Sequence, residues 1–205
     1  ICLFLILILG ISHGALDNIK GKKLLKLFGY KSTVSFYLIY IFISFLIIVF
    51  WLIFPNTVLF LFLIVASYHF GKEDTVFYFK RKFLISEILF FFKGSSVILV
   101  PLLLQRDKTN EIFEILNFNV FKSTVFNDPF LIVILCLSFL SSLLISSKKN
   151  TSIKGIMIMD FLSILVLNFF LTPILAFTLY FCFLHSIRHS IRLIFELDKS
   201  FKSGL

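Results

Sequence analysis

Four histidines are the residues of this chain whose type and spacing could do chemistry. The chain has 205 residues and only four histidines, which are His13, His69, His185 and His189. His185 and His189 stand four residues apart in the stretch HSIRHSIR, so on a helix they share one face. Neutral imidazole is the commonest metal ligand among side chains. The four histidines therefore favour a metal site over isolated polar anchors near a membrane surface.

Each of the first two histidines is followed by an acid four residues later. Asp17 follows His13 in HGALD, and Glu73 follows His69 in SYHFGKED. A ligating imidazole usually donates its second N–H to a carboxylate or a carbonyl. We therefore expect Asp17 and Glu73 to hold the rings of these ligands. Solvated acids at a membrane surface would give the same pattern, and this alternative stays open.

The donor set alone does not select the metal. Four imidazoles leave positions open on a six-coordinate ion, and imidazole suits iron, zinc, copper and nickel alike. Cys2, Cys136 and Cys182 lie in apolar runs without a C-x-x-C spacing and are expected to be inert thiols. A metal site that opens to a bilayer suggests an apolar substrate with few hydrolysable bonds. Oxygen chemistry at iron would suit such a substrate best.

The rest of the sequence predicts membrane helices that must position these residues. The chain is 59% hydrophobic and 15% charged, against about 45–50% and about 25% in soluble domains. Apolar runs predict seven spans, at about residues 1–13, 34–54, 57–71, 83–104, 129–147, 153–171 and 173–194. Backbone in lipid must satisfy its own hydrogen bonds. We therefore predict an all-α integral membrane protein, a bundle of about seven transmembrane helices in a single polytopic domain, 1–205.

The loops between the predicted spans indicate their orientation. The first, third and fifth loops and the C-terminal end are basic, whereas two of the alternate loops carry no charge and the 105–128 loop mixes both signs. Basic loops face the cytoplasm. At a rise of about 1.5 Å per residue, all four histidines can then meet in one layer in the cytoplasmic half. The basic loops account for the net charge of +9. We therefore expect membrane lipid as a partner and do not expect nucleic acid.

Two predicted spans carry charged residues away from their basic ends, namely Glu87 and Lys93 in the span 83–104 and Asp160 in the span 153–171. Such groups cost at least about 2.5 kcal/mol near the centre of a bilayer. Each is therefore expected to face the bundle, and Lys93 could pair with Asp160. Alternatively the fourth span starts later, which would leave residues 83–92 as an interfacial helix.

Three histidine motifs occur in order along this multispan chain: HGALD at 13–17, SYHFGKED at 67–74 and HSIRH at 185–189. In this arrangement the chain resembles the Brp/Blh family of bacterial β-carotene 15,15′-dioxygenases. The resemblance implies a multi-pass enzyme of the bacterial inner membrane that uses Fe2+ and O2. It would split the central double bond of β-carotene into two molecules of all-trans retinal. The resemblance further implies His13, His69, His185 and His189 as the iron ligands, and a rhodopsin as a candidate recipient of the retinal.

Four aromatic residues flank the expected ligands, which are Tyr68, Phe70, Phe181 and Phe183. They are candidates to line the slot for the polyene, with ordinary core packing as the alternative. No catalytic residue beyond the metal ligands is expected. We expect the chain to be truncated at its N-terminus, and truncation at the C-terminus stays open. Two other functions stay open as well, a haem-binding electron carrier and a transporter with a histidine relay.

Overall fold

The computed structural model describes residues 2–10, 21, 25–29, 33–76, 84–146 and 151–197, and every regular element in these ranges is a helix. The elements are α1 (Cys2–Leu5), η1 (Ile6–Gly10), α4 (Thr33–Ile53), α5 (Pro55–Val76), α6 (Leu84–Leu104), α7 (Arg106–Ile115), η2 (Val120–Lys122), η3 (Thr124–Phe126), α8 (Asp128–Ser146), α9 (Thr151–Phe170), α10 (Pro173–Leu179), η4 (Tyr180–Ser186) and α11 (Ile187–Leu197). Of the short elements, η1 and η4 are π-helices, and η2 and η3 are 3₁₀-helices. The all-α prediction is thus confirmed for the described residues.

Five helices in the described ranges are long and apolar enough to cross a membrane. They comprise Val34–Ile53, Ile85–Leu104, Asp128–Ser146, Thr151–Phe170 and Pro173–Arg192. The predicted count of seven is therefore not confirmed. With 22 residues α5 is long enough to span, but its C-terminal half is polar, with His69 and Lys72 among its residues. The described part of the first predicted span, residues 2–10, is too short to be counted.

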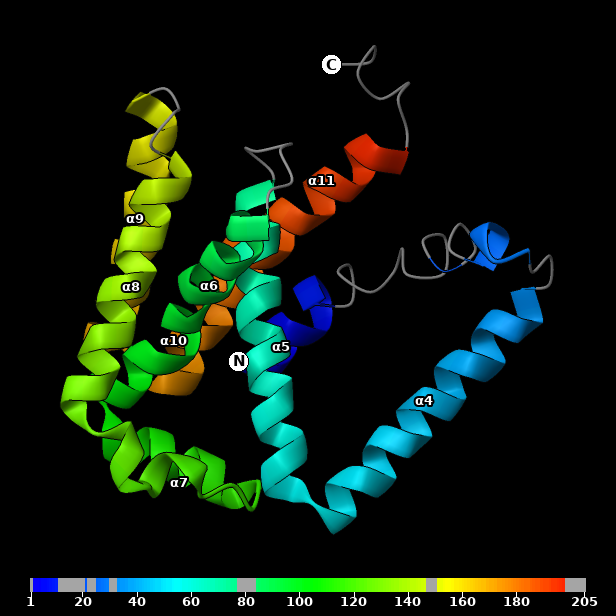
Figure 1. Ribbon diagram of the computed structural model, residues 1–205, viewed down its shortest axis with the longest axis horizontal. Coiled ribbons are helices and arrows are strands. Elements are labelled where there is room, and N and C mark those ends of the chain that lie inside the picture. Colours follow the sequence, from blue (N-terminus) through cyan, green and yellow to red (C-terminus); the bar gives the residue numbers. More distant parts are fainter. Residues whose placement is uncertain are drawn as a thin grey trace.

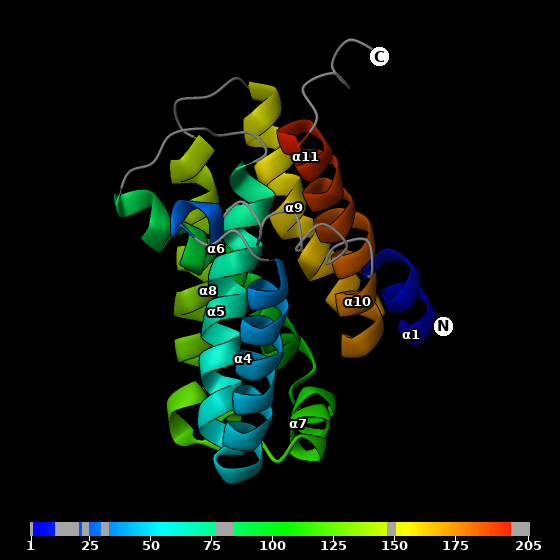
Figure 2. The ribbon, with the colours of Figure 1, turned by 90° about the vertical axis from the view of Figure 1, so that its right-hand side faces the viewer.

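Most helices form one bundle, and α4 stands apart from it (Figure 1). α6 packs against α5, α8 and α9, and α5 and α9 also contact a rod made of α10, η4 and α11 in succession. α7 lies across one end of the bundle, and α4 diverges from α5 after the turn at Phe54. α1 packs against α10 and η1 against η4, as Figure 2 shows for the N-terminal segment beside the rod. Because α5 also contacts η4 and α11, the elements around the second, third and fourth histidines are neighbours.

α5 and α6 touch through their backbones. A Cβ atom on Gly71 would overlap the carbonyl oxygen of Phe90, and one on Gly94 would overlap the carbonyl oxygen of Ser67. Small residues permit this close approach between membrane helices. The contact fixes the face of α5 that looks away from α6, and that face carries His69.

The charged residues Glu87, Lys93 and Asp160 differ in their exposure. Lys93 and Asp160 are each 7% exposed, and Lys93 Nζ lies 3.8 Å from Asp160 Oδ2, so the predicted pairing is confirmed. The Glu87 side chain is instead 38% exposed and pairs with Lys72 at 3.2 Å. α6 runs without a break from Leu84 to Leu104, which argues against the alternative of a separate interfacial helix over residues 83–92.

Candidate functional site

The structure brings three of the four histidines together where α5 meets the last rod. Ring centroids are 5.2 Å apart for His69 and His185, 6.2 Å for His69 and His189, and 6.4 Å for His185 and His189. His185 has no exposed surface and His189 is 5% exposed. His13 and Asp17 lie outside the described residues. The helix before them, η1, ends at Gly10 and packs against η4.

The last rod widens into a π-helix over the seven residues Tyr180–Ser186, which include His185. Such π-helical turns are frequent at functional sites. On an α-helix, side chains four residues apart point in directions that differ by about 40°. The wider turn of the π-helix reduces this difference. The rings of Phe177, Phe181, His185 and His189 accordingly form a column with successive interplanar angles of 16°, 24° and 17°.

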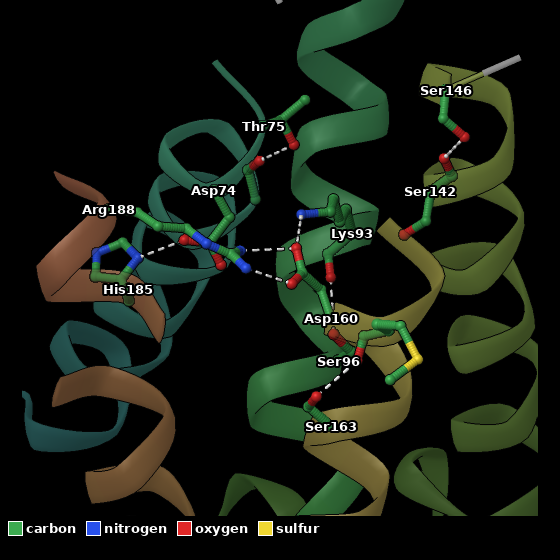
Figure 3. Close-up of polar contacts among 12 residues, drawn as sticks. Asp74, Thr75, Lys93, Ser96, Ser142, Ser146, Asp160, Ser163, His185 and Arg188 are labelled. Carbon is green, nitrogen blue, oxygen red and sulfur yellow. Dashed lines mark hydrogen bonds and ion pairs between the residues drawn. The ribbon is translucent and has the colours of Figure 1, made fainter. Parts of the chain in front are cut away.

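Asp74 holds the ring of His185. The Nδ1 atom of His185 lies 2.9 Å from Asp74 Oδ1, and the Tyr180 hydroxyl donates to Asp74 Oδ2 at 2.6 Å. All three side chains are buried, and Figure 3 shows the contact between Asp74 and His185. We assign the Nδ1 proton from its carboxylate partner. Nε2 of His185 is then the unprotonated nitrogen, which can act as a metal ligand.

Glu73 serves a different histidine from the one that the sequence spacing suggests. Its Oε2 atom lies 2.7 Å from Nδ1 of His189, and Arg192 approaches its two oxygens at 2.9 and 3.1 Å. We expected Glu73 to hold His69, which precedes it by one turn on the same helix. The carboxylate reaches His189 on the facing rod, because that rod packs against this side of α5.

Asp74 is the functional residue that sequence reasoning missed. It directly follows the expected Glu73, and both acids follow His69 within five residues. Consecutive residues point about 100° apart on a helix. The signal was therefore present in the pair of acids, but only the packing of α5 shows that each acid reaches a separate histidine of the last rod.

The carboxylates of this region already have permanent cations beside them. Arg188 donates two hydrogen bonds to Asp160, at 2.7 and 2.8 Å, and Asp74 lines a small cavity together with Lys93. Together with the Glu73–Arg192 pair, the described part of this cluster contains three acids and three bases. The acids are Glu73, Asp74 and Asp160, and the bases are Lys93, Arg188 and Arg192. The cluster is thus electrically balanced when its imidazoles are neutral, which is the form that binds a metal.

The donor set fits a metal in its chemistry, since it offers several imidazoles with two of them oriented by carboxylates. Among the described residues, no group of three or more His, Cys, Asp or Glu side chains stands close enough together to hold a metal ion. Ligation by the three converging histidines, and by His13 outside the described ranges, therefore stays a prediction.

The four predicted lining residues have different surroundings. Phe70 is buried and meets the His185 ring edge-on at 4.8 Å, and Phe181 stacks on that ring at 5.8 Å. The Tyr68 hydroxyl enters a polar cluster with α6, and Phe183 is 49% exposed. Only Phe70 and Phe181 among these four residues therefore lie directly against the ring of His185.

An apolar cavity lies elsewhere in the bundle. It has a volume of about 240 Å³ between α5, α6 and residues 121–134, and α5 contributes Phe60, Leu63, Ile64 and Ser67 to it. At about 100° per residue, these four side chains leave α5 on roughly the opposite side from His69. The cavity is therefore separated from the histidines by α5 itself.

Comparison with known proteins agrees with the resemblance of the three motifs. A family model described as beta-carotene 15,15'-dioxygenase matches residues 4–204, which include all four histidines. No curated protein and no solved structure matches the chain. From this match over nearly its whole length, the chain belongs to the β-carotene 15,15′-dioxygenase family.

Proposed function

We propose that this protein is a non-haem Fe(II) dioxygenase that cleaves the central 15,15′ double bond of β-carotene with O2 and forms two molecules of all-trans retinal. Membership of the family supports a carotene dioxygenase. The observation that carries the finer proposal is the convergence of His69, His185 and His189, with Nδ1 of the last two rings held by carboxylates.

In this proposal His13, His69, His185 and His189 hold the metal through neutral imidazole nitrogens. Fe2+ bound there supplies the redox-active centre that O2 requires to react with a hydrocarbon. Imidazole is a suitable ligand for iron. The orientation predicted from the basic loops puts this centre in the cytoplasmic half of the bacterial inner membrane, where a rhodopsin could take up the retinal.

The residues around the rings orient the ligands and exclude water. Asp74 and Glu73 fix the tautomers of His185 and His189, and Phe70 and Phe181 cover the His185 ring with apolar surface. The overall reaction adds one oxygen atom to each carbon of the cleaved bond and neither consumes nor releases a proton. The site therefore needs no general acid or base, in keeping with carboxylates that all have partners.

Expression in β-carotene-producing cells tests the proposal. The cells should bleach from orange, and retinal should be recovered from the extract by chromatography. His69→Ala should abolish retinal formation while the protein still inserts, and Phe169→Ala, which alters a ring on α9 that is 72% exposed, should retain it. Chelation should abolish activity in membranes, and added Fe2+ should restore it. Normal retinal yield from His69→Ala would overturn the assignment of the site.

A further inference from the structure

A buried lysine lies behind the pair formed by His185 and Asp74. Lys93 on α6 is 7% exposed, and its Nζ atom lies 3.8 Å from Asp160 Oδ2. That separation is too long for a hydrogen bond, and Asp160 already accepts two short ones from Arg188. Within the described residues, no hydrogen bond from this ammonium reaches another protein group. An ammonium has three donors, and burial without acceptors is costly.

The ammonium borders a small polar cavity. The cavity has a volume of about 10 Å³, and Lys93, Asp74, Asp160, Tyr180 and Ser142 are among its lining residues. Figure 3 shows the Lys93 side chain directed toward Asp160, with Asp74 on the neighbouring helix. A volume of about 10–15 Å³ admits one water molecule, and polar cavities with two to four partners hold water whereas apolar ones stay dry.

We propose that this cavity binds one ordered water molecule, which accepts a hydrogen bond from Lys93 and donates to Asp74 and Asp160. The water then has three partners, the usual number for a buried water. It joins the carboxylate that orients His185 to the carboxylate that anchors Arg188. His185 and Arg188 stand three residues apart on the same rod, so the polar chain closes a loop around the HSIR turn.

A methyl group added to the cavity tests whether water occupies it. Ser142→Thr keeps the hydroxyl and fills space, whereas Ser146→Thr adds the same group one turn further on α8, where the residue is buried but does not line the cavity. If water is bound, Ser142→Thr displaces it and lowers the melting temperature of the metal-free protein in detergent. If the cavity is an unoccupied void, the methyl group fills it and the melting temperature stays level or rises, which overturns the proposal.

A double-mutant cycle separates loss of the water from simple crowding. Lys93→Met removes the ammonium and leaves Asp160 paired with Arg188, and Asp74 bonded to His185 and Tyr180. Once the ammonium is absent, Ser142→Thr should cost much less than in the wild-type background, because contacting residues couple. Ser146→Thr should cost the same in both backgrounds. Equal cost of Ser142→Thr with and without Lys93 would overturn the proposal.

A structure of the metal-free protein at a resolution that shows water gives the direct answer, even if Lys93→Met does not fold. Density within hydrogen-bond distance of both Lys93 Nζ and an Asp74 oxygen is expected. An empty cavity there would refute the water site. None of these three measurements uses carotene cleavage, so failure of the proposed reaction and failure of the water site remain distinguishable.

Discussion

In soluble proteins apolar side chains are buried and polar ones are exposed. The consecutive helices α4 and α5 of this chain do the opposite. α4 is strongly apolar, yet none of its Val34–Ile53 segment is buried. α5 is too polar to count among the five apolar spans, yet it packs against α6, η4 and α11 and buries Ser67, Asp74 and Thr75. In lipid, apolar side chains gain little from helix contact, whereas small and polar residues gain a partner. The polar helix α5 therefore marks where the candidate site of this bundle lies.

The largest expected effect comes from breaking the polar interior that α5 helps to build. Asp160→Ala would remove the carboxylate that pairs with the buried Lys93 and the partly buried Arg188. Removal of one partner from a buried ion pair costs about 3–5 kcal/mol, so we expect a large loss of folded protein and a lower melting temperature in detergent. Asp107→Ala on the exposed side of α7 is the matched control and should change little. Equal stability of the two variants would mean that the polar interior does not hold the bundle together.

The next effect comes from the backbone contact between α5 and α6. Gly94→Ala drives a methyl group into the carbonyl of Ser67, and overpacking of this kind typically costs about 1–3 kcal/mol. Gly155→Ala on α9 meets no atom within 4 Å, and Ala is favoured over Gly inside a helix by about 0.5–1 kcal/mol. The free energies of unfolding, measured by denaturant titration in micelles, should therefore change with opposite signs. A shared sign would argue against close approach of α5 and α6.

A smaller effect concerns metal affinity rather than folding. Asp74→Asn keeps an acceptor for His185 but removes the negative charge, and loss of such a partner typically weakens metal binding by about 10–100-fold. Calorimetric titration of purified protein with Co2+ as a stand-in for Fe2+ would measure the change. Tyr180→Phe removes only one hydrogen bond to Asp74 and should weaken binding less. Unchanged Co2+ affinity in Asp74→Asn would remove His185 from the proposed ligand set.

The sequence predicted the helices best where apolar length alone decides them. The predicted spans at 129–147 and 153–171 differ by no more than two residues from α8, Asp128–Ser146, and α9, Thr151–Phe170. The third predicted span stops at residue 71, whereas α5 continues to Val76. Hydropathy ends a helix where polar residues begin, and it has no information about partners such as His185 and His189 that make those residues suitable for burial.

The site was predictable in its histidines and not in their partners. Depth along the two spans that carry them is a property of the sequence, so convergence of His69 with His185 and His189 could be anticipated. The choice between Glu73 and Asp74 depends on how α5 is rotated against the last rod. That rotation is set by the contact of Gly71 on α5 with Gly94 on α6. The spacing of the histidines in the sequence does not depend on this contact, so the spacing could not reveal the rotation.

The smallest expected effect belongs to α4 and tests the other half of the comparison. Leu38 on α4 is 64% exposed, whereas Leu102 on α6 is 1% exposed. Leu102→Ala should cost about 2–5 kcal/mol in the free energy of unfolding, as buried Leu→Ala changes do. Leu38→Ala should stay within about 0.5 kcal/mol, as surface changes usually do, because its side chain meets hydrocarbon whether or not α4 is folded onto the bundle. A cost for Leu38→Ala that approaches the cost for Leu102→Ala would show that α4 is packed against protein in the membrane, and exposure of α4 would then no longer follow from its apolar sequence.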